Sequence, residues 1–297
     1  MAECRFCGNK AGWFKEVHEE CQKRHDQALR DARELAGQAA LDPDMRAKFK
    51  GMILSIAKDG FLSASEQAQA VVGGLADAVR LTLEDKILSK DEEDRLALFL
   101  MESGFEKQIR ESPVAEQIAM AGALREVMEG KIPQRVKLPE DHALPFILQA
   151  DEALVWAFPD VTYLTEKTRR SYVGGTSGAS VRVARGLYWR VGAFKGRPIE
   201  TSSIEAVDTG NLYITSEALY FKGDREMFRA PFRQLIGYEA YDDGIGVWKS
   251  NANAKQKLFS VGKGKGWFVY NLVRNLAELE AQPAQGGRVK GFGGASD

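Results

Sequence analysis

All three cysteines of the chain lie within its first 21 residues, in the stretch CRFCGNKAGWFKEVHEEC. Cys4 and Cys7 form a C-x2-C pair, and His18 and Cys21 follow at a spacing of three, which places both on one face of a helical turn. Three thiolates and one imidazole are a usual ligand set for a structural zinc ion. The sequence therefore predicts a zinc site whose ligands are Cys4, Cys7, His18 and Cys21.

His25 is the alternative fourth ligand, because it lies one helical turn beyond Cys21. We favour His18, whose shorter reach leaves the start of the helix at the metal. Residues 1–25 are too few to bury a core, so the metal has to supply the free energy of folding. Four protein ligands leave no open position for water, so we expect a structural zinc. The knuckle, a short hairpin around Ala11–Phe14 and the following helix resemble treble-clef zinc modules.

The composition is that of an ordinary soluble protein, with 44% hydrophobic residues, 28% charged residues and a net charge of −1. This balance gives no overall attraction to nucleic acid or to membranes. No apolar run approaches the roughly 20 residues that span a bilayer, and charged residues interrupt any signal-peptide core. We expect a cytoplasmic protein without a transmembrane segment, with peripheral membrane attachment as an open alternative.

Residues 26–130 have the apolar spacing of a helical bundle. Asp42-Pro43 and Ser112-Pro113 are typical helix starts, because they combine a capping side chain with proline at the first helical position. The repeated pattern D-x-x-L-S-x-x-E predicts two capping boxes, Ser63 with Glu66 and Ser89 with Glu92. From 45 to 130 the segment resembles the TerB-like helical domains. The resemblance implies the bundle alone, because no acidic cluster lines a helix face.

Residues 131–149 contain three prolines and are predicted to form an extended linker. From 150 to 282 the apolar period changes to two, as in short antiparallel strands, and the segment ends in an amphipathic helix. The stretches GNLYITSEALYFKG and FRAPFRQLIGYEAYDDGIGV, together with that helix, resemble bacterial PH-like and GRAM-type domains. The resemblance implies an antiparallel β-barrel capped by a C-terminal helix. The glycine-rich residues 283–297 are predicted to be a disordered tail. The expected fold class is multidomain α+β.

The sequence contains no convincing catalytic constellation, so we expect no enzyme. The loop GKGKGW (262–267) is the best candidate for binding an anion, because its glycines free backbone amides at a helix N-terminus. Basic residues on neighbouring predicted strands and loops extend this candidate. The anion- or lipid-binding candidates are Lys263, Lys265, Trp267, Arg169, Arg170, Arg182 and Arg185.

These features together predict a non-enzymatic adaptor that binds a protein partner, with a bacterial stress or phage-defence system as its setting by resemblance. Three alternatives stay open. The first is a protein that binds anionic lipid through the PH-like domain. The second is a nucleic-acid binder that uses basic residues of the zinc module, where acidic neighbours oppose the contact. The third is a hydrolase whose site has no recognised motif.

Overall fold

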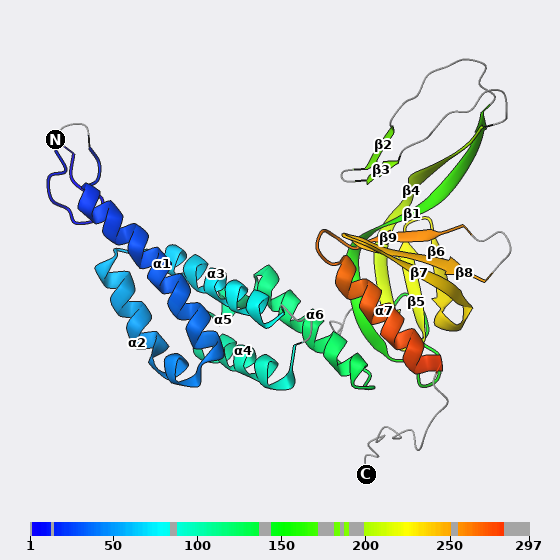
Figure 1. Ribbon diagram of the computed structural model, residues 1–297, viewed down its shortest axis with the longest axis horizontal. Helices are drawn as coiled ribbons and strands as arrows, with labels where there is room; N and C mark the ends of the chain where they lie inside the picture. Colours follow the sequence, from blue (N-terminus) through cyan, green and yellow to red (C-terminus); the bar gives the residue numbers. More distant parts are fainter. Residues whose placement is uncertain are drawn as a thin grey trace, which may run out of the picture. The chain divides into compact units, whose positions relative to one another are not determined.

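The computed structural model describes residues 2–12, 15–83, 88–136, 144–171, 181–184, 187–189, 199–250 and 255–281 (Figure 1). The chain divides into two compact units, Met1–Arg125 and Glu126–Asp297. Helices dominate the first unit, and an antiparallel sheet followed by one helix forms most of the second. The fold is therefore mixed α+β. The described helices include none long and apolar enough to cross a membrane.

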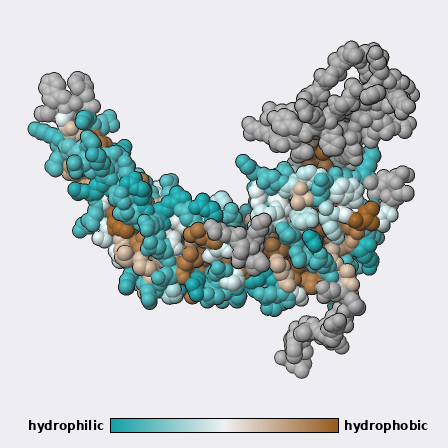
Figure 2. Space-filling model, in the orientation of Figure 1, coloured by the Kyte–Doolittle hydropathy of each residue, from teal (hydrophilic) through white to brown (hydrophobic). Residues whose placement is uncertain are grey.

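The first unit carries the helical region that the apolar spacing predicts. The face of this unit seen in Figure 2 is mostly hydrophilic, with apolar residues in small groups. The helices are α1 (Glu19–Leu41), α2 (Pro43–Asp59), α3 (Ala64–Thr82), α4 (Lys90–Glu102), α5 (Glu106–Arg110) and α6 (Pro113–Met128), which contains the boundary between the units.

The ends of these helices follow local sequence rules. Asp42 caps α2 by accepting hydrogen bonds from the backbone of Asp44 and Met45. Both predicted capping boxes are confirmed: the Ser63 hydroxyl accepts from the Glu66 amide while the Glu66 carboxylate accepts from the Ser63 amide, and the same exchange joins Ser89 to Glu92 at α4. Each box satisfies two backbone donors that a helix start otherwise leaves unpaired.

Helices α1 and α3 approach each other closely because small residues line their contact. A Cβ atom added to Gly37 of α1 would lie 3.2 Å from the Gly74 carbonyl oxygen of α3. The two helices also bury other small residues, which are Ala32, Ala36 and Ala40 on α1 and Ala70 and Ala78 on α3. A Cβ atom added to Gly74 would overlap the Arg33 carbonyl oxygen and lie 2.8 Å from the Ala36 Cβ. The backbones are therefore too close for any side chain at Gly74.

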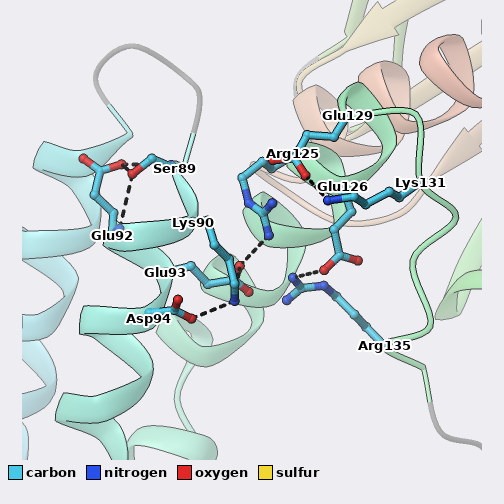
Figure 3. A network of polar contacts seen from close by, with 10 residues as sticks. All are labelled: Ser89, Lys90, Glu92, Glu93, Asp94, Arg125, Glu126, Glu129, Lys131 and Arg135. Atoms are coloured by element: carbon cyan, nitrogen blue, oxygen red, sulfur yellow. Dashed lines mark hydrogen bonds and ion pairs between the residues drawn. The ribbon is translucent and has the colours of Figure 1, made fainter.

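A buried ion pair joins α6 to α4 (Figure 3). The Arg125 guanidinium donates to the Glu93 carboxylate at 2.8 Å, and both side chains are over 90% buried. Lys90 lies 3.8 Å from the same carboxylate and 2.7 Å from Asp94. Because an uncompensated charge is costly in a buried site, this pair specifies how α6 sits on α4 within the first unit.

The second unit is built on a seven-stranded antiparallel sheet of order β6-β5-β4-β1-β9-β8-β7. A separate two-stranded sheet pairs β2 with β3, the 3-10 helix η1 (Phe232–Gln234) follows β6, and α7 (Gly266–Ala281) packs on β7 and β8. The strands are β1 (Leu154–Ser171), β2 (Val181–Ala184), β3 (Leu187–Trp189), β4 (Ile199–Thr215), β5 (Ala218–Gly223), β6 (Met227–Pro231), β7 (Leu235–Tyr241), β8 (Gly244–Lys249) and β9 (Lys257–Ser260).

The sheet is not closed into a barrel, which corrects the expectation from the sequence. Strands β6 and β7 are neighbours along the chain but stand at opposite edges of the sheet, and no pairing among the described residues joins them. Phe268, Leu272 and Leu276 of α7 are fully buried, and the ring of Phe268 meets that of Trp156 in β1 with centroids 4.8 Å apart. The C-terminal helix thus covers part of an open sheet.

Strand β1 is continuous through an irregularity between Phe158 and Val161. There its pairing with β4 shifts register, and Asp160 is left-handed with a φ of 54°. This bulge bends the strand without ending it. Beyond Thr165, β1 pairs only with β4 among the described residues, so the two form a ribbon that extends past the other strands (Figure 1).

The end of the predicted linker belongs to the second unit. Phe146 stacks on Tyr220 at 3.9 Å between ring centroids and meets Tyr213 edge-on. Glu152 is buried and accepts hydrogen bonds from Thr215 and Tyr220. Residues 146–152 are therefore anchored to the sheet, whereas the predicted tail 283–297 lies outside the described residues.

The contact between α1 and α3 predicts opposite effects for two adjacent glycines. Gly74→Ala should lower the free energy of unfolding by about 1–3 kcal/mol through overpacking. Gly73→Ala is the matched control: its Cβ would meet only the Arg33 side chain at 3.5 Å, so the better helix propensity should leave stability unchanged or raise it by up to about 1 kcal/mol. Urea unfolding followed by circular dichroism measures both, and equal effects would contradict the close contact.

Candidate metal centre

The first ten residues form a tight knuckle. Glu3 pairs with Lys10 in a β-bridge, and the Cys4 amide donates to the Asn9 carbonyl at 2.7 Å. Gly8 adopts a left-handed φ of 72° and donates its amide to the Cys4 carbonyl at 2.9 Å. This turn places Cys4 and Cys7 on the same side of the hairpin. The predicted hairpin around Ala11–Phe14 stays a prediction, because Trp13 and Phe14 lie outside the described residues.

The start of α1 supplies the other two ligands. His18 is the residue before the helix and Cys21 lies in its first turn. The Nδ1 atom of His18 lies 3.4 Å from the Cys7 Sγ and 3.7 Å from the Cys21 Sγ. The ligand atoms of all four residues lie within 4.8 Å of one another, and Cys4 is buried. No other group of three or more His, Cys, Asp or Glu in the described ranges is placed to hold a metal.

These separations fit one tetrahedral metal ion. Zinc–sulfur bonds of about 2.3 Å and zinc–nitrogen bonds of about 2.0 Å put sulfur and nitrogen ligands about 3.5 Å apart in a tetrahedron. The His18 Nε2–H donates to the Lys10 carbonyl at 2.9 Å, which leaves the Nδ1 lone pair directed at the thiols. A metal-ligating histidine is usually held this way by its second nitrogen. The four residues can therefore bind a metal ion.

The electrostatics of the thiols also favour a cation between them. Burial opposes ionisation of Cys4, but backbone hydrogen bonds from Cys7, His18 and Phe6 lower its pKa to about 6. Burial, followed by the hydrogen bonds and charges of Cys7 and Cys4, raises the pKa of Cys21 to about 11. The thiols cannot all ionise in so small a space, unless a metal ion compensates their charge.

His25 lies apart from this cluster. Its side chain projects from α1 and is buried. Its Nδ1 donates to the Gly60 carbonyl at 2.8 Å, and its Nε2 lies 3.2 Å from the Glu66 carboxylate. Both ring nitrogens are therefore engaged by the helical bundle. The ligand atoms that gather at the knuckle are those of the favoured set with His18, and not those of the alternative with His25.

In the loop between β9 and α7, the backbone amides of three residues are engaged within the protein. Gly266 donates its amide to the Asp242 carbonyl, Gly262 donates to the Asp243 carbonyl, and the Lys265 amide bonds to Gly262 within the loop. A Cβ on Gly266 would overlap the Tyr241 carbonyl oxygen, so this glycine serves close packing. Lys263 is exposed, whereas Trp267 is half-buried and packs against Phe268.

The loop and the predicted arginines of β1 belong to different points along that strand. Ser260, two residues before the loop, pairs with Thr162 in the middle of β1, whereas Arg169 and Arg170 lie near its end at Ser171 and Arg182 lies in β2. The seven residues from Thr162 to Arg169 measure about 23 Å along an extended strand. Binding of one anion by the loop and these arginines stays a prediction. Arg185 lies outside the described residues.

Two half-buried lysines stand at the end of the sheet where the ribbon leaves it. The Lys257 Nζ donates to the Tyr163 hydroxyl at 2.6 Å and lies 3.9 Å from the centre of the Phe228 ring. Burial lowers the pKa of Lys257, and burial with the charge of Lys257 lowers that of Lys249. No motif in the sequence indicated this pair. Its signal is the period of two in β9, which puts Lys257 on the same face as buried Phe259.

Comparison with known proteins leaves the family open. No protein-family model matches the chain, and no curated protein matches it. The resemblances to treble-clef, TerB-like, PH-like and GRAM-type domains therefore remain expectations from sequence. What can be said of the metal centre comes from its own geometry.

Single substitutions separate the two candidate histidines. His18→Ala should reduce zinc affinity by more than about 100-fold. It removes a ligand, and the loss of a residue that only hydrogen-bonds a ligand already costs about 10- to 100-fold. His25→Gln should keep stoichiometric zinc, since its ring nitrogens bond to Gly60 and Glu66. Elemental analysis and competition with a chromogenic chelator measure both variants. Zinc loss from His25→Gln with retention in His18→Ala would reverse the assignment.

Proposed function

We propose that this chain is a non-enzymatic interaction protein that holds one structural zinc ion at the knuckle and docks a protein partner on its second unit. The observation that carries the proposal is the closed set of four ligands, in which His18 is fixed by Lys10. Three thiolates and an imidazole select a soft or borderline metal, and tetrahedral geometry favours zinc. A site with four protein ligands has no position for a substrate or a reactive water.

An edge strand supports the docking part of the proposal. Strand β7 pairs only with β8 in the described part of the chain, so its other edge has backbone donors and acceptors for an added strand. Ile236 on this strand is 71% exposed. An exposed apolar residue on an open edge is a usual feature of strand addition, and soluble proteins otherwise protect such edges with charge. The TerB-like and PH-like resemblances add a bacterial stress or phage-defence setting to the proposal.

A charge on the edge tests the docking surface. Ile236→Lys should abolish binding of proteins that co-purify with the wild-type chain and crosslink to residues 235–241, because a lysine there opposes strand addition. Met227→Lys is the matched control on the opposite edge strand, where Met227 is 51% exposed. Crosslinking mass spectrometry of complexes from the source cells provides the measurement. Equal retention by both variants, or equal loss from both, would contradict docking at β7.

An anionic ligand is a second candidate function, favoured by the lysine pair. Lys257 and Lys249 lie close enough for their charges to interact, and they stand at the end of the sheet from which the ribbon extends. Over residues 166–205 the sequence has eight Lys or Arg and only three Asp or Glu, in a chain whose net charge is −1. Such a local positive excess attracts phosphate-bearing surfaces.

Vesicle flotation distinguishes this candidate. If the lysine end binds anionic lipid, Lys257→Ala should reduce co-flotation with vesicles of phosphatidylcholine and phosphatidylserine by at least about threefold, given roughly 1 kcal/mol for each basic residue near such a surface. The Lys263→Ala, Lys265→Ala double variant should float like the wild type, because β9 runs from Lys257 at Thr165 to Ser260 at Thr162 and so leads away from the ribbon before the loop begins. Flotation that is unaffected by Lys257→Ala, or absent from the wild type, would reject the lipid role.

A further inference from the structure

Phe6 projects from the metal knuckle onto the helical bundle. It lies between Cys4 and Cys7 in sequence, and its ring stacks on the His25 imidazole with centroids 4.5 Å apart and planes inclined by 26°. The same ring lies 5.8 Å from that of Phe61, which follows α2. The position of Phe6 therefore depends on the backbone that carries two ligands. Its contacts belong to the α1 helix and to the turn between α2 and α3.

His25 joins that turn to α1 on both of its sides. One ring nitrogen donates to the Gly60 carbonyl in the turn, and the other faces the Glu66 carboxylate that closes the Ser63 capping box. A Cβ on Gly60 would overlap that of Ala28, so the turn lies directly on α1. Through its stack on His25, Phe6 is therefore connected to both the turn and the first residues of α3.

The turn itself has a strained residue next to Phe6. Phe61 adopts a left-handed φ of 57°, a conformation that large L-residues rarely take. Such strain persists only where surrounding contacts hold it. The turn is closed by the Leu62 amide, which donates to the Ala57 carbonyl at 2.8 Å, and by a longer 3.4 Å bond from the Phe61 amide to Lys58. The ring of Phe6 is one of the contacts that hold Phe61 in place.

We propose that metal binding at the knuckle controls the conformation of the α2–α3 turn, residues 60–63, through Phe6. With the metal bound, the knuckle keeps Phe6 on His25 and Phe61, and the strained turn is closed. When the metal leaves, the ligands move apart, Phe6 withdraws, and Phe61 relaxes and becomes exposed. The proposal rests on the metal site of the proposed function, and makes the turn the element of the bundle that responds to metal.

Hydrogen exchange of the full chain tests this control. Chelation of zinc should speed exchange of the Leu62 amide by at least about tenfold, because local opening exposes its hydrogen bond. Amides of residues 96–99 in α4, whose side chains Leu96 and Phe99 are fully buried, should keep their rates. Unchanged exchange at Leu62, or equal acceleration in α4, would overturn the proposal, the second because it would indicate general unfolding of the unit.

Substitution of Phe6 separates this coupling from the metal site. Phe6→Ala keeps all four ligands, so it should retain zinc and yet show fast exchange at Leu62 when loaded. Phe6→Tyr should restore the slow rate, and Lys15→Ala, an exposed position near the knuckle, should match the wild type. A slow rate in zinc-loaded Phe6→Ala would refute the role of Phe6. If the purified wild-type chain contained no zinc, the metal site of the proposed function would be refuted instead. The exchange rate at Leu62 in Phe6→Ala would then still show whether the Phe6 ring holds the turn closed.

Discussion

Three thiols and one imidazole share a space in which no two ligand atoms are more than 4.8 Å apart, and the N-terminal part of the structure depends on this crowding. Burial raises the pKa of Cys21 to about 11, and the hydrogen bonds and charges of Cys7 and Cys4 add to this increase, so thiolates placed together without a cation repel one another. A divalent metal reverses the sign of that interaction and makes the same crowding stabilising. The knuckle has few apolar residues to bury, so the metal bond has to replace a hydrophobic core.

The metal centre is continuous with the helical bundle, because two of its ligands lie at the start of α1, the longest helix in the described part of the chain. His18 precedes α1 and Cys21 lies in its first turn, where the helix dipole favours thiolates. From there α1 packs along α3 through small residues, so it joins the knuckle to the centre of the first unit. Phe6 adds a second connection through His25. Any effect of the metal on the bundle therefore has two routes, along α1 and across to the α2–α3 turn.

Local sequence signals predicted what depends on neighbouring residues. The spacing of Cys4, Cys7, His18 and Cys21 indicated the cluster, and Ser-x-x-Glu identified two helix starts, because both features operate within one or two turns of chain. Contacts between distant segments were not predictable in this way. Nothing in the sequence near His25 indicates Gly60 or Phe6 as its neighbours. The antiparallel register likewise brought Ser260, two residues before the 262–266 loop, to the middle of β1, seven residues from Arg169. The strand order left β6 and β7 at opposite edges of an open sheet.

The central claim is that one metal ion is bound by three sulfurs and one nitrogen. X-ray absorption at the zinc edge of the purified full-length chain tests it most directly. We expect a shell of three sulfur atoms at about 2.3 Å and one nitrogen atom at about 2.0 Å, with no bound water. A shell made mainly of oxygen and nitrogen, or a zinc edge too weak for one ion per chain, would contradict the account.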